Sequence, residues 1–579
     1  MKDLSESLDN LISRVHLQWT RVSAWTRSTT TIWPELLLTV FVGAVVLYVV
    51  RNMWFFGDDW NMLIFRRQLM ENGEWFRYLF APHNEHLSTV VILVMTGLQS
   101  LFGVGSAVPF LAVVVIAHVA IVWVIRCFLV RFGVPMIPRM VAILWFGLLG
   151  AGAENLVWPF QMAYIGALAL TLWGLYFVTT PEPKLRTDIA ACLLFLAGLF
   201  TAGTAIPVLI VSVVLVLWNR RWGQALRVFA LPVVIYVAWF VFYGASRQPE
   251  HPSALTQVVP YMTRGISFGL DQIVQFSVLG FVAGVVALVV LVMSDWVTGL
   301  HRQTLLTLVS AIAVFFLMGG VGRSYFGVEQ SEAVRYVYVL GALAIPLLIV
   351  IGSRAVTWRP RFAYVAWGFV LIAIVGNVGA LIAFRNDRIA LTNDAKWKFA
   401  SAVEYLDVAQ VADDVRPEPT YNPDVSIKGL RFLRDQGLWS SNVHLSEAMQ
   451  LDAAARFGLR TGFASKPQGL DLANATIVSI EGATASISGD CTVVQPTGAT
   501  SQVVLQSKPA ATFSIDTHGA PSMLYVRSQS DPELHSVAID TGTAGATAPV
   551  WVMTFPLTGQ PVLVLPTGVT TTLCGASTQ

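Results

Sequence analysis

Charged residues are scarce in this sequence. Asp, Glu, Lys and Arg make up 12% of its 579 residues, whereas they make up about 25% of an ordinary soluble domain. Hydrophobic residues make up 55%, and the mean hydropathy is +0.63. So little charge over so much apolar chain excludes a disordered or an ordinary soluble protein. We therefore expect a membrane protein.

An excess of charge of one sign is missing too. The 37 Lys and Arg residues and the 35 Asp and Glu residues leave a formal charge of +2. The chain therefore has no global basic field, and we expect no nucleic-acid partner. Four cysteines are too few for a disulfide framework. The sequence contains no Walker loop and no dinucleotide fingerprint, so we expect no nucleotide chemistry.

The apolar residues are concentrated in one part of the chain. Residues 33–384 form a succession of long apolar runs, whereas residues 385–579 contain no run long enough to span a bilayer. This division predicts an α-helical polytopic membrane unit over 33–384. We expect an extracytoplasmic helical or linker region at 385–475 and a β-sandwich at 476–579. Residues 1–32 read as a cytoplasmic amphipathic segment.

The basic loops decide how many spans there are. Short cytoplasmic loops are rich in Lys and Arg, and each span needs about 20 apolar residues. All the basic clusters fall on one side only if the short run 87–102 dips into the outer leaflet without crossing. The sequence then predicts about eleven spans in a plasma-membrane protein, with the N terminus cytoplasmic and the C-terminal domain outside. The predicted spans are 33–50, 108–126, 140–152, 161–179, 189–202, 204–218, 228–243, 276–293, 305–320, 335–351 and 362–384.

Acidic residues gather in the first predicted outer loop. Five of the fourteen Asp and Glu residues between 33 and 384 lie there. Asp58 and Asp59 are flanked by aromatic residues, among them Trp60, which is a candidate for contact with the substrate. A carboxylate at the depth of the headgroups is costly unless it is partnered or used, so this pair is a functional candidate. The alternative is a helix N-cap, for which one Asp is enough.

A second polar group follows in the same loop, where the sequence reads Pro82-His83-Asn84-Glu85-His86. His83, Glu85 and His86 are candidates for contact with a polar substrate. Together with Asp58 and Asp59 they could bind a divalent cation, because His nitrogens and carboxylate oxygens are common metal ligands. The alternative is that Pro82 starts the next helix and its polar neighbours cap it.

Later outer loops add further polar residues. Glu154, with Gln161 close behind it, lies in the turn after the third span, and Arg323 precedes the tenth span, which opens with Arg335 and Tyr336. A guanidinium offers forked donors that suit phosphate. The alternatives for Arg335 are snorkelling or an ion pair with Glu329 or Glu332. Acids, His and Arg converging on the outer membrane surface suit a lipid-linked sugar phosphate, which needs a phosphate site and a base for its acceptor.

The order of these motifs resembles the GT-C superfamily of polytopic glycosyltransferases. That group includes protein mannosyltransferases, aminoarabinose transferases, oligosaccharyltransferases and mycobacterial arabinofuranosyltransferases. Its acidic motif, Gly-aromatic segment, Pro-containing motif and terminal Phe-Gly look like Asp58-Asp59, Asn72-Gly73-Glu74-Trp75, Pro82-His83 and Leu101-Phe102-Gly103. The family's Lys-Pro-Pro or His-Pro-Pro motif is replaced here by Pro-His-Asn-Glu-His.

The resemblance implies roles for particular residues. Asp58, ranked ahead of Asp59, would be the general base that deprotonates an acceptor hydroxyl, with inversion at the sugar carbon. Arg335 would hold the donor phosphate, and Glu154 resembles the second outer-loop acid of the superfamily. Mg or Mn is used by some members and absent from others.

The C-terminal region has its own pattern. From about residue 476, short Val, Ile, Thr and Tyr runs alternate with Gly, Pro and Asp, as in an antiparallel sandwich. Cys491 and Cys574 could form one disulfide there, as an oxidising exterior permits. A carbohydrate-binding domain and a packing or lid domain are both open.

The sequence therefore predicts a membrane glycosyltransferase of the cell envelope. It would move a sugar from a polyprenyl-phosphate donor to a glycan or other envelope acceptor. A transporter or flippase of lipid-linked glycans, which would bind with the same residues, is the alternative. A non-catalytic glycan receptor is a third reading, although one span would suffice to anchor it.

Overall fold

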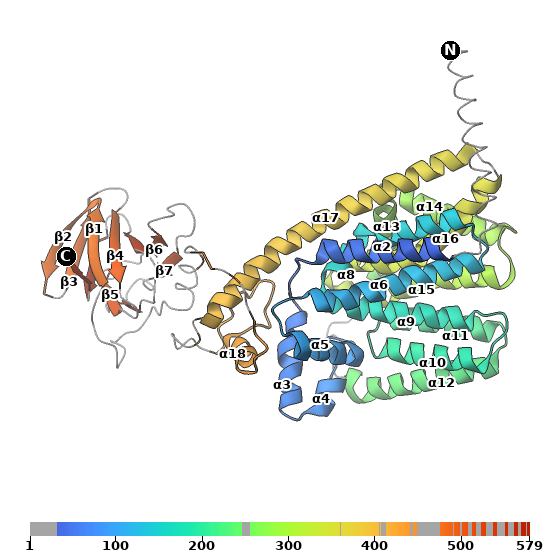
Figure 1. Cartoon of the computed structure of the whole chain (residues 1–579), viewed down its shortest axis with the longest axis horizontal. Helices are drawn as coiled ribbons and strands as arrows, with labels where there is room; N and C mark the ends of the chain where they lie inside the picture. Colours follow the sequence, from blue (N-terminus) through green and yellow to red (C-terminus); the bar gives the residue numbers. More distant parts are fainter. Residues whose placement is uncertain are drawn as a thin grey trace, which may run out of the picture. The chain divides into compact units, whose positions relative to one another are not determined.

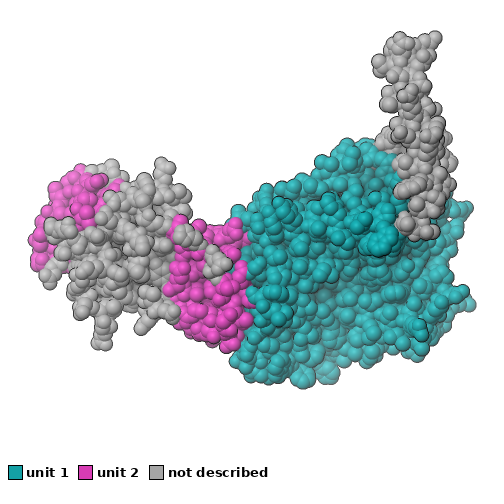
Figure 2. Space-filling view, in the orientation of Figure 1, with its two compact units in different colours: residues 1–55, 65–102, 106–391 teal, residues 56–64, 103–105, 392–579 magenta. Residues whose placement is uncertain are grey.

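The computed structural model describes residues 32–245, 255–358, 361–404 and 413–440 and, beyond these, chiefly the strands given below. The predicted amphipathic segment at 1–32 lies outside the described residues, except for its last residue. The chain divides into two compact units, coloured teal and magenta in Figure 2. The first unit comprises residues 1–55, 65–102 and 106–391, and the second comprises residues 56–64, 103–105 and 392–579.

The first unit is helical. Its long helices are packed side by side, as α6, α9, α10 and α12 show in Figure 1. The helices that carry predicted spans are α2 (Trp33–Val50), α6 (Val108–Arg131), α7 (Met136–Gly147), α9 (Met162–Val178), α10 (Leu185–Leu199), α11 (Ala205–Trp218), α12 (Trp222–Trp239), α14 (Leu279–Met293), α15 (Gly299–Arg323), α16 (Val334–Trp358) and α17 (Arg361–Glu404). Short elements connect them: α3 (Arg67–Glu71), α4 (Trp75–Phe80), α5 (Thr89–Phe102) and α8 (Ala153–Val157).

Each of the eleven predicted spans overlaps one of these helices. Within the described residues, eight helical segments are long and apolar enough to cross a membrane, where consecutive short helices are taken together. The number is up to nine if the bent pair of α13 (Leu255–Val274) and α14 counts as one span. The protein is therefore a multi-pass membrane protein, and the count of eleven stays a prediction. The run predicted to dip without crossing is α5, one of two shorter apolar helices.

The predicted cytoplasmic ends of three helices are joined by ion pairs. Glu35 near the start of α2 is 1% exposed, and its carboxylate accepts hydrogen bonds from Arg126 of α6 and Arg139 of α7. A buried carboxylate needs such partners, because an unpaired charge in a low dielectric is costly. Two of the basic residues used to assign the loops therefore also bind α2 to its neighbours.

One predicted outer loop, 244–275, proves to contain a 20-residue helix, α13 (Leu255–Val274). Its buried residues recur at helical spacing, with Val258, Tyr261 and Gly265 among them, which explains why it folds onto α15 and α16. The chain then bends by 103° into α14. Asp271 caps the new helix, because its carboxylate accepts hydrogen bonds from the backbone N–H groups of Val278 and Phe281.

Asn377 of α17 holds this bend against the rest of the first unit. Its Nδ2 donates to the carbonyl oxygen of Ile273 at 3.0 Å, and its Oδ1 accepts from the backbone N–H of Ala151 at 2.9 Å. Trp145 of α7 donates to the same carbonyl at 3.1 Å. Backbone groups that lose their helical partners at a break inside a membrane protein need other hydrogen-bond partners. The side chains of Asn377 and Trp145 provide them here and so stabilise the break.

The second unit combines short segments from the first outer loop with the end of α17. Trp60 packs edge to face against Phe399, and the backbone N–H of Gly57 donates to Asn422 Oδ1 at 3.1 Å. Val104 donates to the carbonyl of Leu438, beside Gly103 at a φ of 63°. A Cβ on Gly103 would lie 2.7 Å from that carbonyl oxygen, so the Phe-Gly motif needs glycine there. Helix α18 (Ile427–Asp435) completes this part.

The C-terminal region consists of two sheets. The first has the order β11-β1-β4-β9-β6-β7 and the second the order β2-β3-β10-β5-β8. The pairings are antiparallel except that of β1 with β11, which agrees with the predicted antiparallel β region. The strands are β1 (Ala475–Glu481), β2 (Ala483–Ser488), β3 (Cys491–Pro496), β4 (Ser501–Ser507), β5 (Thr512–Asp516), β6 (Met523–Ser528), β7 (Val537–Asp540), β8 (Val550–Met553), β9 (Pro561–Leu565), β10 (Thr571–Cys574) and β11 (Ala576–Thr578).

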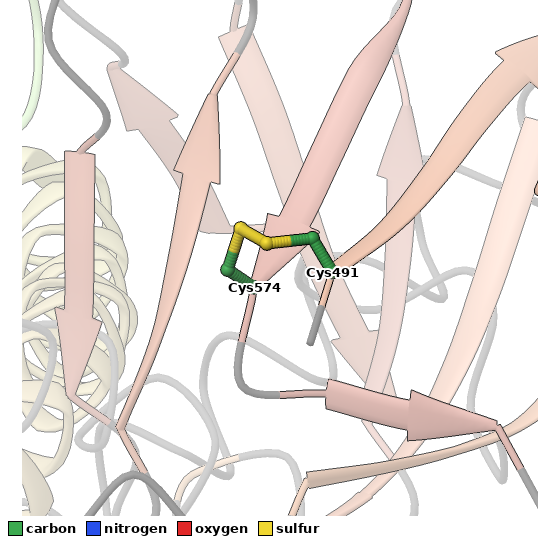
Figure 3. Close-up of a disulfide and its surroundings, with 2 residues drawn as sticks. All are labelled: Cys491 and Cys574. Carbon is green, nitrogen blue, oxygen red and sulfur yellow. A yellow bond between two sulfur atoms is a disulfide. The ribbon is translucent and has the colours of Figure 1, made fainter. Parts of the chain in front are cut away.

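The predicted disulfide is present. Cys491 and Cys574 lie opposite each other on β3 and β10 with their Cα atoms 4.0 Å apart, and Figure 3 shows the bond between them. It links residues 83 positions apart in sequence.

This disulfide gives a test of the predicted sidedness. In intact cells, a thiol reagent should label Cys491 and Cys574 only after reduction, because an oxidising exterior keeps them paired. Mass spectrometry of the labelled peptides would measure it. A cytoplasmic C-terminal domain would instead show two free thiols without reductant, as expected for Cys127, which carries a free thiol here.

Candidate functional site

The second unit contains the predicted acidic motif, and its two aspartates differ. Asp59 is 0% exposed, and its Oδ2 accepts a hydrogen bond at 3.0 Å from the backbone N–H of Phe56. This carboxylate reaches back three residues at a helix start, as in half of a capping box. Asp58 is only half-buried. The geometry therefore gives Asp59 a capping role and leaves Asp58 as the more accessible candidate base.

Trp60 is fully buried in the same segment and packs against Phe399. Its position in the second unit is that of a core residue. Contact between Trp60 and a substrate stays a prediction from the sequence.

The polar turn in the first unit is a tight one. The backbones of His83 and His86 exchange two hydrogen bonds of 3.0 Å, and Asn84 takes up a φ of 50° between them. Asn tolerates this left-handed conformation better than most residues. The turn places Glu85 and His86 at the edge of a cavity. His83 instead packs its ring against Phe160 and is 7% exposed.

Arg66 fixes the approach to this turn. Its guanidinium donates to the carbonyl oxygens of Arg77, Tyr78, Ala81 and Pro82 at 2.7 to 3.2 Å. The side chain is 1% exposed, and burial lowers its pKa to about 10, which still leaves it protonated at neutral pH. The sequence did not indicate a role for Arg66, because its partners are backbone carbonyl groups, which every residue has.

We expect Arg66→Ala to disorganise the polar turn. Removal of the guanidinium leaves four buried or half-buried carbonyls without their donor, at about 1 kcal/mol or more each. The thermal midpoint of the detergent-purified protein should fall by several degrees, together with any activity that depends on Glu85. Arg67→Ala is the matched control, since Arg67 makes a salt bridge that is partly exposed. An equal effect of both changes would contradict the role given to Arg66.

The cavity has a volume of about 260 Å³. Its apolar wall comes from α11, α12 and α15, and its polar side comes from the 83–86 turn and the ends of α9, α15 and α16. The buried Oγ1 of Thr204 lines it and has no hydrogen-bond partner among the described residues. The lining residues are Glu85, His86, Tyr164, Gly203, Thr204, Ile206, Pro207, Tyr236, Phe240, Tyr261, Phe315, Phe316, Met318, Gly319, Gly322, Arg323 and Tyr336.

One arginine–glutamate pair lines the polar side of the cavity, and a second pair adjoins it. Arg323 donates to Glu85 at 3.1 Å and to the hydroxyl of Tyr336 at 3.3 Å. Arg335 donates to Glu154 through its side chain at 2.9 Å and through its backbone N–H at 3.1 Å. The pairs adjoin, because Arg335 and Tyr336 are neighbours in the chain. Arg323 therefore brings one guanidinium group to the polar side of an otherwise apolar cavity, and Arg335 holds a second one beside it.

The partner of Arg335 was not among the sequence alternatives. Glu329 and Glu332, proposed as its structural partners, pair with Arg264 of α13 instead, at 3.1 and 2.7 Å. That alternative is wrong because it treated 244–275 as loop and so overlooked a helix that brings its own arginine. The sequence did place Glu154 and Arg335 at the same membrane depth, and the structure joins them.

His86 is neutral in this setting. Burial, with the neighbouring Arg323 adding to it, lowers the pKa of His86 to about 4. Its ring approaches Gly203 so closely that a Cβ there would lie 2.7 Å from Nδ1. A neutral imidazole at neutral pH can accept or donate a hydrogen bond but adds no charge to the cavity.

The other predicted residues have structural partners. Gln161 is 2% exposed, and its Oε1 accepts from Asn155 Nδ2 at 3.2 Å. Among the Tyr and Thr residues of the cavity, sequence reasoning missed Tyr164, Thr204, Tyr236 and Tyr261. A Tyr or Thr within a long apolar run is a weak signal, because either residue can equally serve packing in a membrane helix.

No group of three or more His, Cys, Asp or Glu side chains suited to a metal ion occurs among the described residues. In the first unit, the Glu85 carboxylate bonds Arg323 and the His83 ring packs on Phe160. This arrangement does not fit a preformed metal centre made of Glu85 and the two histidines. Use of Mg or Mn remains a prediction.

Comparison with known proteins gave structural likenesses alone. No family model and no curated protein matches the chain. ArnT from Cupriavidus metallidurans, in a crystal structure bound to undecaprenyl phosphate, is similar over 66% of this chain and 82% of its own, with 17% identity and a TM-score of 0.38. Arabinosyltransferase EmbB from Mycobacterium smegmatis is similar over 94% of this chain, with 12% identity and a TM-score of 0.36, and this chain spans 64% of its length.

Both neighbours are GT-C polytopic membrane glycosyltransferases, the superfamily that the sequence motifs resemble. The TM-scores lie below 0.5, so the function proposed below rests on this chain's own residues.

Proposed function

We propose that the protein is a membrane glycosyltransferase that takes its sugar from a polyprenyl-phosphate-linked donor. The observation that carries this is the cavity at the ends of α9, α15 and α16. It places Arg323 on the polar side of a largely apolar space, and Arg335 lies next in the chain to the lining residue Tyr336. A lipid-linked sugar phosphate combines an anionic centre with an apolar tail, and this cavity offers a complement to each.

The arginines would bind the donor phosphate. Guanidinium groups make charge-assisted, forked hydrogen bonds to phosphate oxygens, and they stabilise the charge that develops on the leaving phosphate. The hydroxyls of Tyr336 and Thr204 are further donors beside the cavity.

Asp58 would be the general base. It would accept the proton of an acceptor hydroxyl as the hydroxyl oxygen attacks the sugar carbon, with inversion at that carbon. This role comes from the sequence resemblance and from the difference in burial between Asp58 and Asp59. The acceptor would be a glycan or another component on the extracytoplasmic side of the plasma membrane. No step is routed through a metal ion.

A transporter of lipid-linked glycans is the second candidate. The break between α13 and α14 favours it, because discontinuous helices line the binding sites of many transporters. Such a protein would bind the donor at the same arginines without breaking its sugar–phosphate bond.

Incubation of the purified protein with polyprenyl-phosphate sugars and glycan acceptors separates the two functions. Mass spectrometry of the acceptor and of the released lipid phosphate reads out transfer. If the protein is a glycosyltransferase, the glycosylated acceptor and the lipid phosphate should form in equal amounts. Donor binding without either product, combined with donor flipping in reconstituted vesicles, would replace this proposal with the transporter.

A further inference from the structure

The charged side chains that line the polar side of the cavity, and those that adjoin it, cancel one another. Arg323 and Arg335 carry two positive charges, and Glu85 and Glu154 carry two negative ones, with each arginine in contact with one glutamate. His86 adds no charge near neutral pH, because burial lowers its pKa to about 4. A site that serves only to attract phosphate would keep its arginines unneutralised, so the glutamates require an explanation.

The proposed reaction changes the charge on the lipid phosphate. The donor is a phosphodiester, which carries one negative charge. Transfer breaks the bond between the sugar carbon and the phosphate oxygen, and the electron pair stays on that oxygen. The acceptor oxygen forms the new bond to the sugar, and its proton passes to the base. The lipid product is a phosphomonoester, whose second pKa is about 6, so it is mostly dianionic at neutral pH.

We infer that Glu85 and Glu154 make the site discriminate between these two lipids. They lower its affinity for the dianionic product more than its affinity for the monoanionic donor. The inference rests on the proposed function, and it assigns the two glutamates a part in product release. Each carboxylate lies within 3.1 Å of the guanidinium that a phosphate would share. Its repulsion therefore acts on the phosphate at close range and is about twice as large for a dianion as for a monoanion.

Partial burial keeps this repulsion from being screened away. The four side chains are between 16% and 29% exposed, and salt screens charges in such positions much less than charges on an open surface. Without the glutamates the same arginines would hold the product more tightly than the donor, and the enzyme would be inhibited by its own product.

The test compares the affinities of two lipids in the same protein. Dissociation constants are measured in detergent for a polyprenyl-phosphate sugar and for the matching polyprenyl phosphate, with wild type and Glu85→Gln. We expect Glu85→Gln to tighten product binding more than donor binding, shifting the ratio of the two constants by about tenfold. Inhibition of transfer by added polyprenyl phosphate should strengthen in parallel. Glu154→Gln should shift the ratio in the same direction.

Glu329→Gln is the matched control. Glu329 is likewise a glutamate paired with an arginine, Arg264, but its side chain is 70% exposed. It should leave the ratio at the wild-type value, and so should Glu85→Asp, which keeps the charge. If Glu85→Gln does not fold, the ratio of the two dissociation constants in Glu154→Gln tests the inference by itself.

The outcomes separate the inference from the function on which it rests. An unchanged ratio in a folded Glu85→Gln or Glu154→Gln protein that still binds both lipids overturns the inference and leaves the glycosyltransferase intact. Wild type that binds neither lipid removes the proposed function itself. A shift of the same size in Glu329→Gln would show a long-range charge effect and would also overturn the assignment to Glu85 and Glu154.

Discussion

Asp58→Asn is expected to lower kcat for sugar transfer by about 10² to 10⁴, the usual contribution of a general base. Asn keeps the size of the side chain but cannot take up the acceptor proton. Donor binding should stay within about twofold of wild type, because the phosphate contacts are assigned to arginines. A transfer assay under saturating donor, with the donor dissociation constant measured separately, distinguishes the two effects.

Asp59→Asn is the control that the structure provides for this change. The amide oxygen of the substituted side chain can still accept the hydrogen bond from the backbone N–H of Phe56, so the helix start should be kept. We expect transfer within a few-fold of wild type. The reverse pattern, with Asp59→Asn inactive and Asp58→Asn active, would exchange the two roles and show that the buried carboxylate is the base.

Much of the membrane unit could be predicted from the sequence because hydropathy carries a strong physical signal. Every predicted span overlaps a helix, and the run set aside as too short is the 14-residue α5. The positions of Glu154 and Arg335 also followed from hydropathy, since one residue follows a predicted span and the other opens a predicted span on the same predicted side of the membrane. The ion pair between them could not be predicted, because it depends on which helices are neighbours in space.

The failures have a common physical origin. Helix α13 mixes its buried apolar residues with Arg264, Asp271 and several Gly and Pro, so its overall hydropathy is low and it read as a loop. Arg66 and Asn377 act on backbone carbonyls, which every residue has, and so they have no partner that a sequence pattern can reveal. The disulfide could be predicted from the sequence because Cys491 and Cys574 are the only cysteines in the predicted extracytoplasmic region.

Loss of either arginine should weaken the binding of the donor, but single substitutions would confuse that effect with misfolding. Arg335→Gln leaves the partly buried carboxylate of Glu154 with the backbone N–H of residue 335 but without the guanidinium that neutralises it, and an uncompensated charge of this kind is destabilising. The informative variants therefore remove each pair together: Arg335→Gln with Glu154→Gln, and Arg323→Gln with Glu85→Gln. Both keep the net charge of the cavity unchanged.

Each double variant should raise the donor dissociation constant by about 10- to 100-fold, since a hydrogen bond to a charged group contributes about 1.5–3 kcal/mol. The corresponding surface variant, Arg264→Gln with Glu332→Gln, also keeps the net charge, and it removes the ion pairs of Arg264 with Glu332 and Glu329 within the first unit. It should leave donor affinity unchanged, which separates loss of a phosphate contact from loss of a pair. If only the Arg323 variant weakens binding, Arg323 alone holds the phosphate and Arg335 fixes the start of α16 to Glu154. Wild-type affinity in both cavity variants would mean that the phosphate lies elsewhere, and the cavity would lose its place in the mechanism.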